Sequence, residues 1–347
     1  MPAWLSTVLL TILKKNPLLY RSLKIFVRIG MMIFCRRIII NKPDFLKSKG
    51  PLLLACNHPN SFLDGVILDI LFEQPVWALA RGDVFKKPFY IKLLTAIKLL
   101  PVYRTSEGAE NLHSNYKTFD ACMDIFRRNG TVQIFSEGKC VNEWHLRPLK
   151  KGTARLAISS WENNIPLNVL PVGINYSAFR KFGKNIYINF GEVISKEDIP
   201  ISETDGKRYH QFNNLLQAQL QTLVFEIGKQ DTARQKEILE RKPSILQKII
   251  FIIPAIAGFI IHAPLYSPIK RFVWRRCNHN DHYDSVLAAI LLFSYPFYLL
   301  LITFLSFFIF KSYYAFFLFL GVPFTAWSYV LLKSQLDVKQ GANNTNL

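Results

Sequence analysis

Short apolar runs alternate with amphipathic segments between residues 41 and 240 of the chain. Apolar runs bounded by turn residues predict buried strands, at 52–55, 76–80, 99–103, 131–135, 167–176 and 186–190. Helical patterns fall between them, at 62–72, 89–98, 109–128 and 153–161. This alternation predicts an α/β domain, with a mainly parallel sheet flanked by helices and a site at the carboxyl ends of the strands. The polar segment 207–241, with Leu and Val at helical spacing, predicts one long surface helix.

The hydrophobic pattern changes after residue 245. Residues 285–310 and 312–332 contain no charged side chain, and each run exceeds the ~18 apolar residues that identify a transmembrane helix. They predict a transmembrane hairpin with a very short turn at Lys311. Basic residues at 270–276 and after 332 predict that both hairpin ends face the cytoplasm. The stretch 249–262 is also uncharged, but nearby prolines leave open whether it is re-entrant, interfacial or a third span.

The first 40 residues are apolar but frequently interrupted by Arg and Lys. Such a segment cannot span a bilayer cheaply, so it lies either in the membrane interface or as an amphipathic helix on the following domain. The chain is therefore expected to comprise a membrane-interface segment, a catalytic domain and a membrane-embedded region, at 1–40, 41–240 and 245–333.

Composition narrows the choice of partners. The chain has 347 residues, half of them apolar, and a formal net charge of +19 at pH 7. A basic, apolar protein suits an anionic membrane surface or anionic substrates, and no nucleic-acid-binding motif is visible, so no nucleic acid partner is expected. The five cysteines lack metal-type spacing and predict reduced, mostly buried thiols, with the catalytic part in a reducing compartment. His58 has no second His or Cys at ligand spacing, so no metal site is expected, and no cofactor is expected either.

Candidate chemistry is concentrated at 57–64, directly after the predicted strand 52–55. His58 falls on the turn, Ser61 is a candidate N-cap, and Asp64 falls in the first turn of the next helix. A carboxylate on one imidazole nitrogen fixes the tautomer, so that the other nitrogen can accept a proton near neutral pH. A hydroxyl deprotonated in this way can attack an acyl carbonyl. Spacing alone favours a structural His and Asp over a catalytic pair.

Three further stretches place polar or conformationally special residues at strand ends. Arg104 follows the strand 99–103 and suits a phosphate or carboxylate clamp, or is an ordinary surface arginine. Glu137 and Gly138 follow 131–135, where the carboxylate either contacts a substrate hydroxyl, orients Arg104 or is simply solvated. The segment 170–174 contains a proline and a glycine and is expected to shape an apolar pocket.

These blocks, in this order, resemble the glycerolipid acyltransferase superfamily, which contains the lysophosphatidic acid and glycerol-3-phosphate acyltransferases. The resemblance covers roughly residues 50–195. It implies that His58 is the general base and that Asp64 orients it. It also implies that Arg104 contacts a glycerol phosphate, that residues 135–138 form the third block and that Pro171 lies in the fourth.

The chain departs from the usual motif pattern of this superfamily, and these departures concern the identity of the acceptor lipid more than the acyl-transfer chemistry. Five residues separate His58 from Asp64 instead of four, which resembles a branch that includes fungal-type glycerol-3-phosphate acyltransferases. Ser136 replaces a proline, and 139–140 are Lys-Cys where Thr-Arg is common. Cationic residues at the start of the next helix are candidates to replace the lost arginine, namely Arg147, Lys150 and Lys151.

The resemblance implies a membrane-bound O-acyltransferase, located on the cytoplasmic face of a bacterial inner membrane. It moves an acyl group from acyl-CoA or acyl carrier protein to a hydroxyl of glycerol-3-phosphate or lysophosphatidic acid. Backbone amides at Asn60 and Ser61, or the Asn60 side chain, are the candidate oxyanion donors. The alternatives are another lyso-lipid or amino-acid-lipid acceptor, and a non-catalytic protein that binds anionic lipid. A hydrolase is disfavoured because no Gly-x-Ser-x-Gly elbow is present.

Overall fold

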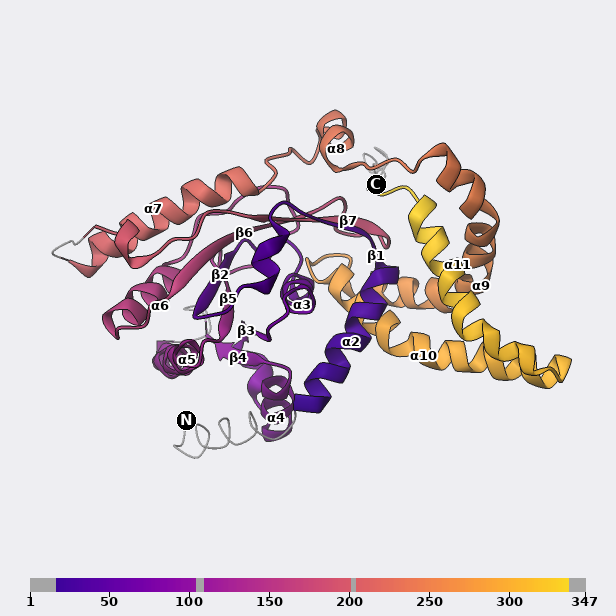
Figure 1. The fold of residues 1–347 in the computed structure, drawn as a ribbon, viewed down its shortest axis with the longest axis horizontal. Helices are drawn as coiled ribbons and strands as arrows, with labels where there is room; N and C mark the ends of the chain where they lie inside the picture. The colour runs from indigo at the N-terminus through magenta and orange to yellow at the C-terminus, as the bar shows by residue number, and fades with distance from the viewer. Residues whose placement is uncertain (1–16, 104–108, 201–203, 337–347) are drawn as a thin grey trace, which may run out of the picture. The chain divides into compact units, whose positions relative to one another are not determined.

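The computed structural model describes residues 17–103, 109–200 and 204–336 (Figure 1). The chain forms two compact units that are each assembled from separate stretches. One comprises residues up to 28, 40–175 and 188–226, and the other comprises 29–39, 176–187 and the residues from 227 onward. The site described below belongs to the first unit and the long apolar helices to the second.

The described residues contain one seven-stranded sheet in the order β1-β7-β6-β2-β5-β3-β4. Strand β2 is central, and it runs parallel to both β5 and β6, while β3 runs parallel to β4 and β5. The sheet is therefore mainly parallel, as predicted. The strands are β1 Cys35–Ile40, β2 Leu52–Cys56, β3 Val76–Arg81, β4 Leu99–Val102, β5 Thr131–Phe135, β6 Asn168–Tyr176 and β7 Lys184–Phe190.

Helices follow the strands as the α/β pattern predicts, and the predicted fold class is confirmed. Helix α3 covers Phe62–Leu71, and helix α6 covers Lys151–Glu162. Among the described residues, the other α-helices before residue 240 are α2 Pro17–Phe34, α4 Pro88–Ala96, α5 Ala109–Arg127, α7 Asp205–Leu223 and α8 Thr232–Leu239.

Two predicted elements differ from the structure. Residues 35–40, expected as part of an interfacial or amphipathic helix, form strand β1, because Ile38–Ile40 is a β-branched run that favours a strand. The predicted helix 207–241 is broken between α7 and α8. Val224 is extended there, and the Asn175 side chain accepts a hydrogen bond from Phe225 N–H and donates one to Leu223 C=O. These tertiary hydrogen bonds satisfy the backbone groups at the end of α7.

The core of the first unit holds β2 in place. All five residues of β2 are buried, as expected for a strand that lies inside a parallel sheet covered on both faces. Helix α7 presents Phe212, Leu216 and Leu220 at intervals of four, and Phe212 packs edge-on against Trp161 of α6. The carboxyl end of β2 is thus fixed by an apolar core.

The second unit contains three helices that are long and apolar enough to cross a membrane. Helices α10 (Tyr283–Phe310) and α11 (Leu318–Leu332) form the predicted hairpin, and Lys311 occupies the left-handed region at its turn with φ 48°. A short 3-10 segment, Tyr313–Phe317, leads into α11. The stretch 249–262 lies in α9 (Ile245–Cys277), which contains three prolines and is strongly curved in Figure 1.

A buried ion pair joins β7 to the start of α10. The side chains of Lys184 and Asp284 are both fully buried and contact each other. The Lys184 ammonium also lies over the rings of Phe34 and Tyr176, at 5.6 and 5.8 Å from their centroids. Because an isolated buried charge is costly, each partner depends on the other.

Lys184→Met is expected to destabilise the protein by about 3–5 kcal/mol, because it leaves the Asp284 carboxylate buried without a counter-charge. Thermal unfolding of the detergent-solubilised protein measures the loss as a lower midpoint. Lys236→Met removes an exposed lysine from α8 and is the matched control, with little shift expected. An equal midpoint for the two variants would contradict a stabilising role for the ion pair.

Candidate active site

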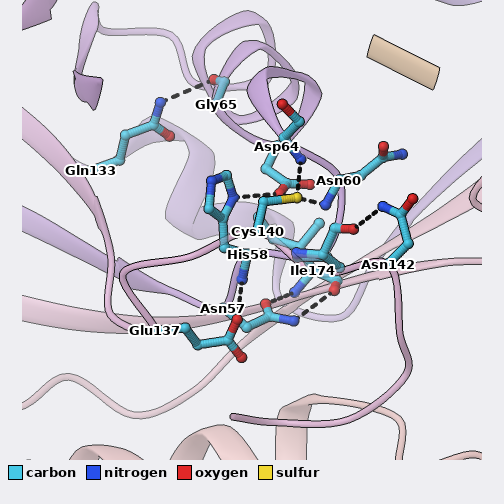
Figure 2. A network of polar contacts seen from close by, with 12 residues as sticks. Asn57, His58, Asn60, Asp64, Gly65, Gln133, Glu137, Cys140, Asn142 and Ile174 are labelled. Carbon is cyan, nitrogen blue, oxygen red and sulfur yellow. Dashed lines mark hydrogen bonds and ion pairs between the residues drawn. The ribbon is translucent and has the colours of Figure 1, made fainter. Parts of the chain in front are cut away.

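The register of the central strands brings two loops to one edge of the sheet. Cys56 at the end of β2 lies beside Phe135 at the end of β5 and beside Val172 of β6. The chain therefore leaves β2 and β5 next to each other. The Asn57 side chain then bonds both backbone groups of Ile174, accepting from N–H at 2.7 Å and donating to C=O at 3.0 Å (Figure 2). These two bonds fix the position at which the β2 turn begins.

His58 and Asp64 meet as predicted. His58 Nδ1 lies 2.8 Å from Asp64 Oδ2, and the Asp64 side chain is fully buried in the first turn of α3. The same carboxylate oxygen accepts a hydrogen bond from Asn60 N–H at 2.8 Å. With Nδ1–H donating to the carboxylate, the imidazole presents Nε2 as its proton acceptor. This is the arrangement that a His–Asp general base requires.

The His58 ring is also held from its flat side. It stacks on Phe135 with 3.9 Å between ring centroids and 11° between the planes. Its backbone N–H donates to Glu137 Oε2 at 3.0 Å. The ring plane, the backbone and the Nδ1 contact are thus each fixed by a different residue.

The loop that follows β5 bonds to the His58 turn at successive positions. Val141 N–H donates to His58 C=O at 3.1 Å, and Asn142 Nδ2 donates to Pro59 C=O at 2.7 Å. Ser61 N–H lies 2.9 Å from Cys140 Sγ, which accepts its hydrogen bond. Figure 2 shows Cys140 and Asn142 close to His58 and Asn60 of the turn. The turn therefore owes its shape to residues about 80 positions later in the chain.

Asn60 and Ser61 lie in this turn, but their backbone N–H groups already have acceptors within the protein, Asp64 and Cys140. Their predicted role as oxyanion donors stays a prediction, and it requires that these N–H groups exchange or share their present acceptors. Ser61 occupies the predicted N-cap position of α3 without a side-chain cap bond, because its φ of 54° and ψ of −140° are not those of an extended N-cap. Substrate contact by either residue stays a prediction.

Glu137 has both carboxylate oxygens engaged with the backbone. Oε2 accepts from His58 N–H, and Oε1 accepts from Arg147 N–H at 3.0 Å. Burial raises the pKa of Glu137, and the two backbone hydrogen bonds oppose that shift. Gly138 is left-handed, with φ +69°, and a Cβ there would lie 3.0 Å from Lys150 Cγ. Glu137 thus holds the His58 turn against the loop, and its predicted substrate contact remains untested.

The cationic candidates lie around the start of α6. Lys150 and Lys151 are exposed there, and Lys150 N–H donates to Ser136 C=O at 2.8 Å. The Arg147 guanidinium pairs with Glu143 at 2.9 Å, so part of its charge is already balanced. Arg104 lies outside the described residues. A helix N-terminus with exposed lysines suits an anionic group, since its first backbone N–H groups have no partner within the helix.

Two cysteines near the turn have different surroundings. Cys56 is fully buried in β2, and burial raises the pKa of its thiol, which fits the predicted strand residue rather than a nucleophile. Cys140, where the family pattern usually has arginine, is buried and bonds to Ser61 N–H. At this position the chain thus has a thiol that helps to shape the turn in place of the usual arginine cation.

Sequence reasoning did not assign roles to several residues that build the site. Asn57 and Gln133 carried a usable signal, since each is a polar residue within or directly after an apolar strand. Gln133 is buried and donates to Gly65 C=O at 3.1 Å in α3. Phe135 and Cys140 carried no such signal. The stacking of Phe135 on His58 and the hydrogen bond from Ser61 N–H to Cys140 Sγ both depend on residues that are far apart in the sequence.

Asn57→Ala is expected to lower the unfolding midpoint markedly, because the buried N–H and C=O of Ile174 each lose a partner at a cost of about 1–3 kcal/mol. Thermal unfolding measures this loss. Asn163→Ala removes an exposed asparagine at the end of α6 and is the matched control. Equal midpoints for the two variants would show that the Asn57 bridge does not stabilise the strand end.

Comparisons with known proteins show that the segment holding this site is similar to acyltransferases. A family model described as Acyltransferase matches residues 10–175. The glycerol-3-phosphate O-acyltransferase 2 of Saccharomyces cerevisiae is 26% identical over 163 residues, which cover 44% of this chain and 22% of the relative. The 1-acyl-sn-glycerol-3-phosphate acyltransferase of Borreliella burgdorferi is 22% identical over 165 residues, 48% of this chain and 61% of the relative. The chain spans less than two thirds of the length of either relative.

Among solved structures, the 1-acyl-sn-glycerophosphate acyltransferase of Thermotoga maritima aligns with a TM-score of 0.41 and 15% identity, covering 60% of this chain and 81% of that one. The segment that the family model matches contains His58, Asp64 and Glu137. The match of residues 10–175 to the acyltransferase family model, together with the two relatives above, confirms the resemblance of this segment to the glycerolipid acyltransferase superfamily.

Proposed function

We propose that the protein is a membrane-bound O-acyltransferase that transfers a fatty acyl group to a hydroxyl of glycerol-3-phosphate or lysophosphatidic acid, a step of phospholipid biosynthesis. The observation that carries the proposal is the 2.8 Å contact between His58 Nδ1 and Asp64 Oδ2 at the end of the central strand. The pair lies within the segment that matches the acyltransferase family. A lipid-binding protein without catalysis does not need an imidazole held in one tautomer.

In the proposed reaction, Nε2 of His58 takes the proton of the acceptor hydroxyl as its oxygen attacks the thioester carbonyl of acyl-CoA or acyl carrier protein. The tetrahedral intermediate then collapses, the C–S bond breaks, and the new ester remains on the acceptor. The imidazolium returns the proton to the leaving thiolate, so no net charge stays on the enzyme. Asp64 balances the charge of the imidazolium, and general-base help of this kind is worth ~10²–10⁴ in rate.

The phosphate of the acceptor is proposed to bind at the start of α6. Lys150 and Lys151 supply exposed positive charge there, beside the Ser136–Gly138 turn that follows β5. Arg147 and Arg104 are the further candidates, and substrate contacts by Asn60, Ser61, Glu137 and Gly138 belong to the same proposal. A helix N-terminus favours an anion through its backbone N–H groups.

The membrane is proposed to be a bacterial inner membrane, with the acyltransferase segment on its cytoplasmic face. The two helices of the α10–α11 hairpin, which have the length and apolarity of membrane spans, support an embedded region. Lysine and arginine precede α10 at 270–276 and lysines follow α11 at 333 and 339, which favours cytoplasmic placement of both hairpin ends.

His58→Ala and Asp64→Asn are each expected to reduce acyl transfer by about 10²–10⁴, because the first removes the base and the second loses the tautomer and the charge balance. Initial rates are measured with labelled long-chain acyl-CoA, or acyl carrier protein, and with glycerol-3-phosphate, lysophosphatidic acid and a neutral lyso-lipid. His210→Ala removes an exposed histidine from α7 and is expected to keep the parent rate. Rates near the parent value in a folded His58→Ala or Asp64→Asn protein would refute the proposed base.

The double variant Lys150→Ala/Lys151→Ala is expected to raise the KM for a phosphate-bearing acceptor about tenfold or more, since removing each cation near a phosphate costs ~1 kcal/mol. The KM for the acyl donor is expected to change little, and Arg104→Ala to show the same split. Lys236→Ala is the control for lost surface charge. Equal effects on acceptor and donor KM would place the phosphate elsewhere, and transfer to the neutral acceptor alone would keep the chemistry but change the substrate.

A further inference from the structure

A group of lysines gathers at the open end of the α10–α11 hairpin. We call Lys181, Lys184, Lys270 and Lys333 the lysine cluster. Lys333 directly follows α11, and its ammonium lies over the Tyr266 ring at 5.7 Å, while that of Lys270 lies over the same ring at 5.9 Å. Lys181 Nζ donates to Ser334 Oγ at 3.3 Å, one residue beyond Lys333. The lysine cluster thus brings together residues from four places: the turn before β7, β7 itself, α9 and the end of α11.

Aromatic rings enclose the Lys333 ammonium. Its Nζ lies 5.9 Å from the centroid of Phe182, 5.7 Å from that of Tyr266 and 5.6 Å from that of Tyr329. Such rings stabilise a cation by their quadrupole but add no negative charge. The positive charge of Lys333 is therefore held in place rather than neutralised.

The cluster contains more positive than negative charge. Burial lowers the pKa of Lys333 to about 8, and the neighbouring ammonium groups of Lys181, Lys270 and Lys184 contribute to the shift. The nearby carboxylate of Asp284 is engaged by Lys184 in the buried pair. Across the described residues, neither Lys270 nor Lys333 forms a salt bridge. An anion beside Lys270 and Lys333 therefore gains attraction without displacing a carboxylate of the described residues.

The position along the chain indicates where that anion comes from. Lys333 stands where the apolar helix α11 ends, and Asp284 stands where the apolar helix α10 begins. Tyr266 and Tyr329 next to Lys333 are residues of the kind found at membrane–water interfaces. Farther along α10, Phe293 and Phe297 are exposed, as expected for side chains that face acyl chains. An anion that meets the cluster beside such a surface is the phosphate of a membrane lipid.

We propose that the lysine cluster binds the phosphate of an anionic phospholipid of the surrounding bilayer. The site shares no residue with the His58–Asp64 pair, and the proposal does not depend on acyl transfer. Lys270, Lys181 and Lys333 contact the phosphate, and Lys184 remains paired with Asp284. The bound lipid supplies a negative charge to Lys270 and Lys333, which form no salt bridge among the described residues.

Native mass spectrometry of the full-length protein in detergent tests this proposal with phosphatidylglycerol, phosphatidylcholine and inorganic phosphate as probes. The parent is expected to retain phosphatidylglycerol in preference to phosphatidylcholine. Lys270→Gln/Lys333→Gln is expected to weaken phosphatidylglycerol binding about 30-fold, at ~1 kcal/mol for each cation. Lys270→Arg/Lys333→Arg is expected to keep it. Lys248→Gln/Lys311→Gln, which removes two exposed lysines outside the cluster, is the control for net charge and is expected to bind like the parent.

Several results would overturn the proposal. These are equal retention of the two lipids by the parent, an equal loss in the control pair, and complete displacement of phosphatidylglycerol by millimolar inorganic phosphate, which would identify a free-phosphate site. Unfolding midpoints of every variant are measured alongside. Should the double glutamine variant fail to fold, the exposed Lys270→Gln alone is expected to weaken phosphatidylglycerol binding about fivefold, and unchanged binding in that variant would count against the proposal.

Discussion

The parallel pairing of β2 with β5 is the constraint on which the candidate active site depends. In a parallel pair both strands end at the same edge, so the residues after Cys56 and those after Phe135 emerge side by side. An antiparallel pairing would send them to opposite edges. The buried core packed on both faces of β2 holds this strand in place. The meeting of His58 with Glu137 and Phe135 follows from this register.

The loop after β5 provides hydrogen-bond partners for the buried backbone groups of the turn after β2. Residues 57–61 leave the sheet through a buried region, and Asn57 and Asn60 are almost completely buried. Buried backbone groups need partners, and a sharp turn cannot provide them all by itself. Glu137, Cys140, Val141 and Asn142 supply them in order along the loop. The imidazole is therefore positioned by an acidic residue and by a sulfur that never touch its ring nitrogens, as well as by Asp64.

Strand ends and the His–Asp pair are predictable from the sequence because their causes are local. The run Thr131–Phe135 has the bounds that its apolar pattern predicts, and a six-residue separation across a strand–turn–helix brings Asp64 back to His58. Features that depend on distant residues escape this reasoning. The break after Leu223 is stabilised by Asn175, and the role of Cys140 depends on Ser61, about 80 positions earlier. The hydrophobic periodicity of the sequence does not indicate such contacts between distant residues.

The second unit shows how burial decides where a lysine finds its counter-charge. Lys184 is fully buried, and no solvent ion or lipid reaches it, so its partner has to come from the chain, as Asp284. Lys333 is only half-buried at the end of an apolar helix, and it lies among aromatic rings without a salt bridge to any described carboxylate. If the cluster were surrounded by water alone, hydration would stabilise the lysine charges equally well, and the aromatic rings would add little stabilisation. Their presence beside two apolar helices favours a counter-charge that is itself amphipathic, with a phosphate for the lysines and acyl chains for the exposed phenylalanines.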